Sequence, residues 1–192
     1  MAYLDAAGLL DLPRPALIGA HQVQNAGAAL AALRLLGVGE AACEAAVTRA
    51  EWPARMQRLR QGPLVAAAGT CELWLDGGHN PAAGQALAEA LTRLPPRPLH
   101  LVTGMLRTKD AAGFLRPLAA RAVALTGVGI PGEPATLTAD ETVAAALEAG
   151  LTAAAAPDLA AAVAGAAARD PHARILICGS LYLAGQVLRE NG

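Results

Sequence analysis

The sequence has few aromatic residues and no long uncharged run, and each absence narrows what the chain can be. Aromatic residues make up 3% of its 192 residues, so the core must be built from Ala, Leu and Val. No apolar run reaches the about 18 uncharged residues needed to span a bilayer, which argues against a membrane protein. Fifteen basic against sixteen acidic residues leave a formal charge of −1. No overall field therefore favours nucleic acid or an anionic membrane, and we expect neither partner.

The sequence also lacks closely spaced cysteines, and it contains almost no lysine. Cys43, Cys71 and Cys178 form no C-x-x-C pair, so they are typical of buried thiols in a reducing cytosol, and we assign no metal ligands. The first residues lack the basic and apolar regions of a signal peptide, so we expect a cytoplasmic protein. Of the fifteen basic residues, only Lys109 is a lysine, which makes it a residue to follow.

From residue 63 onward, short apolar runs alternate with Ala- and Leu-rich helical stretches, which is typical of βαβ units around a mostly parallel sheet. Strands are predicted near 64–67, 72–76, 99–103, 121–126 and 174–178. The first two are expected to form a hairpin. Helices are predicted near 81–94, 110–120, 139–149, 157–168 and 180–190. The sequence thus predicts an α/β, Rossmann-like domain over residues 63–192.

Residues 1–62 have a different pattern, with one extended stretch and apolar helices near 21–36 and 40–50. A strand and two helices are too few to bury a core alone, so residues 1–50 are interpreted as the remnant of a preceding domain. The first helix would turn Val23, Ala26, Leu30 and Leu33 towards a missing core. We therefore expect residues 1–50 to be loosely held or to self-associate. Residues 51–62 would form a hinge or linker.

Polar residues follow the strands at their carboxyl ends, where open α/β sheets bind ligands. Asp76 and His79 follow one strand, and Lys109 and Ser180 follow two others. The residue types suit an anion, since Lys109 and Ser180 also stand at the starts of helices. Simpler structural roles remain open. Asp76 and Ser180 could cap turns or helices, and Lys109 could pair with Asp110 or face solvent.

Two phosphate-binding motifs can be tested directly. GVGIPG (127–132) matches G-x-G-x-x-G and follows a strand, but Pro131 and Pro134 come next where a dinucleotide site needs a helix. No G-x-x-x-x-G-K-[ST] segment occurs. The chain therefore has no phosphate-binding loop of its own.

Five segments occur in a telling order: HQVQNAGAALAAL (21–33), WPARMQRL (52–59), LDGGHNPAAGQAL (75–87), TGMLRTKD (103–110) and CGSLYLAGQV (178–187). Together they resemble the C-terminal half of the folylpolyglutamate synthase/dihydrofolate synthase family, within the Mur ligase superfamily. The D-G-x-H-N-P and G-S-L-Y-L segments are the most specific. Three positions depart from the family pattern. Ala54 replaces the usual Gly before the Arg, Gly78 replaces Ala, and Thr108 replaces a common acidic residue.

The resemblance implies an ATP-dependent ligase of folate biosynthesis and one-carbon metabolism. ATP would phosphorylate a dihydropteroate or folate carboxylate, and the amine of L-glutamate would attack the acyl phosphate. ATP and Mg²⁺ would be held mainly by an N-terminal ATPase domain outside this chain, so the chain alone is expected to be inactive. Whether dihydropteroate, tetrahydrofolate or both accept the glutamate stays open.

The resemblance also implies roles for individual residues. Asn25 and Arg55 would contact the adenine side and the phosphates of ATP. Asp76 would contact its ribose or a hinge-facing polar group, and His79 beside it would be catalytic. Lys109 and Ser180 would receive the carboxylates of glutamate.

Two functions of other classes remain open on the sequence. One is a stand-alone nucleotide- or metabolite-binding module that uses the same sheet edge without catalysis. The other is an oligomerisation or scaffold domain whose loop residues only cap helices.

Overall fold

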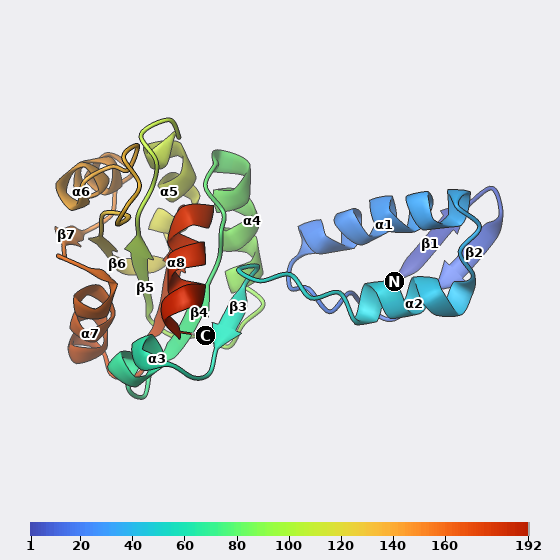
Figure 1. Ribbon diagram of the computed structural model, residues 1–192, viewed down its shortest axis with the longest axis horizontal. Helices are drawn as coiled ribbons and strands as arrows, with labels where there is room; N and C mark the ends of the chain where they lie inside the picture. Colours follow the sequence, from blue (N-terminus) through green and yellow to red (C-terminus); the bar gives the residue numbers. More distant parts are fainter. Residues whose placement is uncertain (192) are drawn as a thin grey trace. The chain divides into compact units, whose positions relative to one another are not determined.

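The computed structural model describes residues 1–191 and divides the chain into two compact units (Figure 1). The first is Met1–Pro53, and the second begins at Ala54. No helix in the described part of the chain is long and apolar enough to cross a membrane.

The first unit is a β-hairpin with two helices. Strands β1 (Ala2–Asp5) and β2 (Gly8–Asp11) pair antiparallel, and helices α1 (Ala20–Leu35) and α2 (Glu40–Thr48) follow. The prediction of a single strand is wrong. The chain reverses at residues 5–8 because Asp5 accepts a hydrogen bond from the Ala7 N–H at 2.9 Å and Gly8 adopts a φ of 116°.

This unit also has a small core of its own, formed by Leu10, Leu12, Leu30, Cys43 and Val47. Ala26 and Leu33 pack against that core, whereas Val23 is 39% exposed. The prediction that these helix residues would face a missing core is therefore wrong for Ala26, Leu30 and Leu33, and for Val23 it stays a prediction. The second strand of the hairpin supplies Leu10, which the sequence pattern did not identify as part of a sheet.

The second unit contains a six-stranded sheet with the order β3-β4-β8-β5-β6-β7. Its strands are β3 (Gln57–Leu59), β4 (Glu72–Leu75), β5 (Leu99–Thr103), β6 (Ala122–Gly127), β7 (Ala153–Ala155) and β8 (Arg174–Cys178). Among the described residues of this sheet, β3 pairs antiparallel with β4, and all other neighbouring strands pair parallel. The predicted α/β, Rossmann-like, mostly parallel fold is thus confirmed.

Two groups of helices sandwich this sheet (Figure 1). Helix α5 (Ala111–Ala119) contacts both α4 (Pro81–Leu91) and α6 (Ala139–Glu148), and α3 (Pro63–Ala68) contacts both α7 (Leu159–Arg169) and α8 (Leu181–Asn191). Alternate residues of the central strands serve the two groups. Ile175 and Ile177 of β8 join the core of α3, α7 and α8. Leu176 between them is equally buried and points to the opposite face.

The predicted strand at 64–67 is wrong, because residues 63–68 form helix α3. A short apolar run suits a buried helix as well as a strand, and here Pro63 starts a helix that ends at Gly69, whose φ is 59°. Asn191 at the end of α8 accepts a hydrogen bond from the Leu64 N–H at 3.0 Å. The antiparallel partner of β4 is instead β3, inside the expected linker.

Candidate functional site

The loops after β4, β5 and β8 meet at the carboxyl edge of the sheet. Leu75 is paired with Ile177, and Thr103 with Cys178, so these three parallel strands end side by side. Gly179 joins the loops. Its N–H donates to the Gly78 carbonyl at 3.0 Å, and a Cβ on it would lie 2.8 Å from Met105. A larger residue at 179 would therefore collide with the end of β5 and the loop that follows it.

A cavity of about 270 Å³ lies between these loops, and its lining includes three of the predicted site residues. His79 follows β4, Lys109 follows β5 and Ser180 follows β8. The remaining lining comes from Leu106, Thr108, Gly179, Leu181 and Tyr182. Three positions that lie up to 101 residues apart in the sequence thus share one cavity.

Lys109 is exposed and forms no ion pair with any residue among 1–191. Asp110, the alternative partner, instead accepts the Gly113 N–H at 2.8 Å and caps α5. The Lys109 ammonium is therefore a cation at the cavity wall without a protein counter-ion in the described chain.

Ser180 is 3% exposed and its Oγ accepts the Tyr182 N–H at 3.1 Å. It therefore stabilises the first turn of α8, as the simpler interpretation held. A hydroxyl that accepts one hydrogen bond still has its own proton to donate. Capping the helix and donating to a ligand in the cavity are compatible roles for this side chain.

His79 is half-buried, with its Nδ1 2.9 Å from the Gly77 carbonyl oxygen. A carbonyl can only accept, so this contact requires the proton on Nδ1, and in the neutral imidazole Nε2 is then the acceptor nitrogen. The bond to its own loop also fixes the plane of the ring.

Asp76 is 5% exposed and organises the turn that carries Arg55. Its Oδ2 accepts the Met56 N–H at 2.8 Å, and its Oδ1 accepts the Gly78 N–H at 2.7 Å. The next residue, Gly77, donates its N–H to the Ala54 carbonyl at 2.8 Å. The Asp76 carboxylate therefore links the Arg55 turn to the loop that holds His79.

The Arg55 turn has an unusual backbone. Ala54 and Met56, on either side of Arg55, have φ values of 56° and 43°, and they are the only described residues other than glycine with a positive φ. Side chains disfavour that region, so the contacts of Asp76 and Gly77 must hold the turn there. Arg55 itself is half-buried, and no hydrogen bond or ion pair to its guanidinium is seen within residues 1–191.

Asn25 belongs to the first unit, on the exposed side of α1. Its Nδ2 donates to Gln22 Oε1 at 3.0 Å, and Gln22 is 6% exposed. This bond orients the amide and leaves its oxygen available as an acceptor. The role of Asn25 towards adenine stays a prediction, as do the ATP roles of Arg55 and Asp76.

Other groups at the sheet edge complete the chemistry. Burial raises the pKa of the Cys178 thiol to about 12, so it stays protonated and is not a nucleophile. GVGIPG does not open a helix, because it is followed by turns at residues 131–132 and 134–135. No group of three His, Cys, Asp or Glu side chains suited to a metal ion occurs within residues 1–191.

The sequence did not identify Thr108 and Tyr182 as lining residues, or Arg107 as an organiser of the loop beside them. Thr138 and Glu141 do carry a readable signal, since T-x-x-E at a helix start predicts a capping box. That capping box is present, and Glu141 also pairs with Arg107.

Comparison with known proteins gives one family match, to the Mur ligase, glutamate ligase domain, over residues 54–181. A probable bifunctional folylpolyglutamate synthase/dihydropteroate synthase of Haloferax volcanii is 31% identical over 187 residues, which are 94% of this chain and 21% of that protein. The folylpolyglutamate synthase of Lacticaseibacillus casei is 33% identical over 86 residues, which are 45% of this chain and 18% of that protein.

Solved structures agree with the sequence relatives. E. coli FolC in complex with DHPP and ADP has a TM-score of 0.79 and 29% identity, over 96% of this chain and 42% of that chain. Mycobacterium tuberculosis folylpolyglutamate synthase complexed with ADP and AMPPCP has a TM-score of 0.75 and 26% identity, over 98% of this chain and 46% of that one. The chain thus spans less than half the length of these relatives.

Proposed function

Because the chain belongs to the Mur ligase family, through its glutamate ligase domain, we propose that it is the C-terminal part of an ATP-dependent ligase. The ligase joins L-glutamate to the carboxylate of dihydropteroate or a folate. One observation carries the proposal. His79, Lys109 and Ser180, from three separate loops, line one cavity at the carboxyl edge of the sheet. The folylpolyglutamate synthases among the relatives support the choice of substrates.

In this proposal the cavity receives the carboxylates of glutamate. The Lys109 ammonium supplies an uncompensated positive charge, and the Ser180 hydroxyl supplies a donor at the start of α8. The side chain of Tyr182 lines the same space, so the bound amino acid is partly enclosed. A charge-assisted contact of this kind is roughly twice as strong as a neutral hydrogen bond, and the second donor, Ser180, restricts the orientation of the carboxylate.

Arg55 and Asn25 contact ATP, which is held mainly by the ATPase part of the ligase. A guanidinium offers a planar pair of donors to a phosphate, and no carboxylate of residues 1–191 pairs with Arg55. Asp76 acts on ATP through Arg55, because its carboxylate fixes the backbone beside that residue. Residues 1–191 gather no set of ligands for Mg²⁺, so we assign no step in this chain to the ion.

The bond-forming step is an attack by the amine nitrogen of glutamate on the carbonyl carbon of the acyl phosphate. A C–N bond forms, the C–O bond to phosphorus breaks, and inorganic phosphate leaves. The ammonium of glutamate must lose one proton before its nitrogen can attack, and a second proton leaves as the amide forms. His79 lines the cavity, and the Nε2 of its neutral ring can accept one of them. The chain therefore contributes orientation of the nucleophile and a proton acceptor.

The test uses a full-length ligase that contains this chain. Lys109→Ala should raise the KM for glutamate about 10- to 150-fold, since losing one charge-assisted contact costs about 1.5–3 kcal/mol. The KM for ATP should stay unchanged. Arg93→Ala is the matched control, because Arg93 is an exposed cation outside the cavity lining. An unchanged glutamate KM in Lys109→Ala would reject the assignment, and phosphate release by residues 1–192 alone would reject the division of labour.

A further inference from the structure

The loop between β5 and α5, residues 104–110, contains Lys109 and is called the Lys109 loop. Backbone hydrogen bonds join it to the segment before α6. The Arg107 N–H donates to the Ala135 carbonyl at 2.8 Å, and the Leu137 N–H donates to the Met105 carbonyl at 2.8 Å. Leu106 and Thr136 form an isolated antiparallel bridge between these bonds. The backbone contacts end at Arg107, two residues before the cation that faces the cavity.

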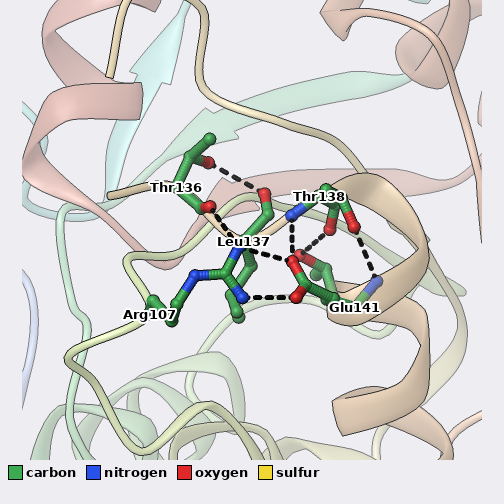
Figure 2. Close-up of polar contacts among 6 residues, drawn as sticks. Arg107, Thr136, Leu137, Thr138 and Glu141 are labelled. Carbon is green, nitrogen blue, oxygen red and sulfur yellow. Dashed lines mark hydrogen bonds and ion pairs between the residues drawn. The ribbon is translucent and has the colours of Figure 1, made fainter. Parts of the chain in front are cut away.

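The Arg107 side chain extends this attachment to α6 itself (Figure 2). Its Nη1 pairs with Glu141 Oε1, and its Nη2 lies 2.9 Å from Glu141 Oε2. The same Nη2 donates to the Thr136 carbonyl at 3.2 Å. Glu141 is itself fixed, because its Oε2 accepts the Thr138 N–H at 2.8 Å in the capping box of α6. Both ends of the ion pair are therefore anchored.

The Arg107–Glu141 pair is a poor candidate for a stabilising contact. The two side chains are 53% and 41% exposed, and exposed ion pairs contribute little to folding free energy. The guanidinium is also no candidate ligand for glutamate, because Glu141 engages it twice and Arg107 is absent from the cavity lining. What the pair does restrict is the path of the chain from Arg107 to Lys109.

We propose that the Arg107–Glu141 pair positions Lys109 in the cavity and so sets the affinity for the glutamate carboxylate. This inference rests on the proposed function of the cavity. Thr108 and Lys109 line the cavity and follow Arg107 in the chain, whereas the backbone bridge at Leu106 precedes it. Within the described residues, Lys109 is held by the hydrogen bond from its N–H to the Leu106 carbonyl at 3.0 Å. Without the ion pair, Lys109 must be ordered at the moment of binding, and that ordering lowers affinity.

The pair persists over the pH range of an ordinary assay. Hydrogen bonds from Arg107 and from the Thr138 N–H lower the pKa of Glu141 to about 2. Its carboxylate is therefore charged at neutral pH, and the positioning effect should be independent of pH there. Glu141→Gln is then the cleanest perturbation, because Gln keeps the capping box while the charge is lost.

The experiment measures glutamate and ATP kinetics of full-length ligase variants. Glu141→Gln and Arg107→Ala should each raise the KM for glutamate about two- to tenfold, the range expected for ordering one long side chain, and leave kcat and the KM for ATP unchanged. Arg116→Ala is the matched control. It breaks an exposed Arg–Glu pair between α5 and α6, which lies outside the Lys109 loop.

A double-mutant cycle separates positioning from other roles. In a Lys109→Ala background, Arg107→Ala should cause no further rise in the glutamate KM. A full additional rise would overturn the inference, since Arg107 would then act independently of Lys109. An unchanged KM in Arg107→Ala and Glu141→Gln, with a raised KM in Lys109→Ala, would overturn the inference and leave the proposed function standing. An unchanged KM in Lys109→Ala would remove the proposed function instead, and the inference with it.

Discussion

Asp76→Asn tests whether one buried carboxylate holds together the two loops that carry Arg55 and His79. The Asp76 oxygens accept the N–H groups of Met56 and Gly78 at 2.8 and 2.7 Å. Asn has a single acceptor oxygen, so one N–H loses its acceptor and faces an amide NH₂. A hydrogen bond to a charged group contributes about 1.5–3 kcal/mol, and a buried orphaned donor costs a similar amount. We expect a loss of about 3 kcal/mol in the free energy of unfolding of the second unit.

The assay must report on that unit alone, because the chain contains two compact units. Trp74 of β4 is 7% exposed and Trp52 of the first unit is 64% exposed. Fluorescence of Trp74 in a Trp52→Phe background therefore follows the sheet. The expected loss corresponds to a midpoint about 10 °C lower, from the usual scaling of Tm with stability. In the full-length ligase, the same substitution should raise the KM for ATP, because the Arg55 turn is released.

Asp110→Asn is the matched control for Asp76→Asn. Asp110 caps α5 through the Gly113 N–H at an exposed position, and Asn caps helices as well as Asp does. Asp110→Asn should therefore have the same unfolding midpoint as the parent protein. Equal midpoints for Asp76→Asn and Asp110→Asn would refute the argument, since the buried carboxylate would then contribute no more than a surface cap.

Three further predictions follow from the structure. Ala54→Gly should stabilise the second unit by about 0.5–1 kcal/mol in urea, because Gly tolerates the φ of 56° that strains Ala; a destabilised variant would show that the turn is unstrained. Burial lowers the pKa of His100, so its stabilising effect should be full above the unfolded value of about 6.5 and be lost as pH falls below it. His100→Leu should then flatten the pH dependence of Tm between pH 7 and 5, and an unaltered slope would contradict this. Leu35 and Leu36 are 89% and 80% exposed, so the chain should self-associate with rising concentration. Leu35→Glu should weaken that association in sedimentation, and a monomer at all concentrations would contradict it.

Residue types and spacing were enough for the central α/β architecture and for the edge where the site lies. Strands that run into glycine and are followed by helices place Asp76, His79, Lys109 and Ser180 after parallel strands, and such strands end at one edge. The order of the five segments indicated the family, and the family match over residues 54–181 confirms that resemblance. These features are local in the sequence, or repeat along it, and that is why they could be predicted.

The errors arose where local preference is ambiguous and distant contacts decide. Residues 63–68 became a helix whose first turn is completed by Asn191, 127 positions beyond Leu64. The strand β3 forms in the expected linker because β4 offers it an open edge. Similarly, residues 2–11 form a hairpin because residues of α1 and α2 pack against its apolar side chains.

The details of the site were decided by tertiary structure alone. No sequence pattern predicts that the Asp76 carboxylate accepts a hydrogen bond from the N–H of Met56, 20 positions earlier. No pattern predicts either that Arg107 pairs with Glu141, 34 positions later. Which residue types stand at the ends of the strands could be predicted from the amino-acid sequence, because periodicity and turn residues are local. Only the folded chain decided which of them meet, because contacts across a sheet depend on strand order, and strand order is set by the packing of the whole domain.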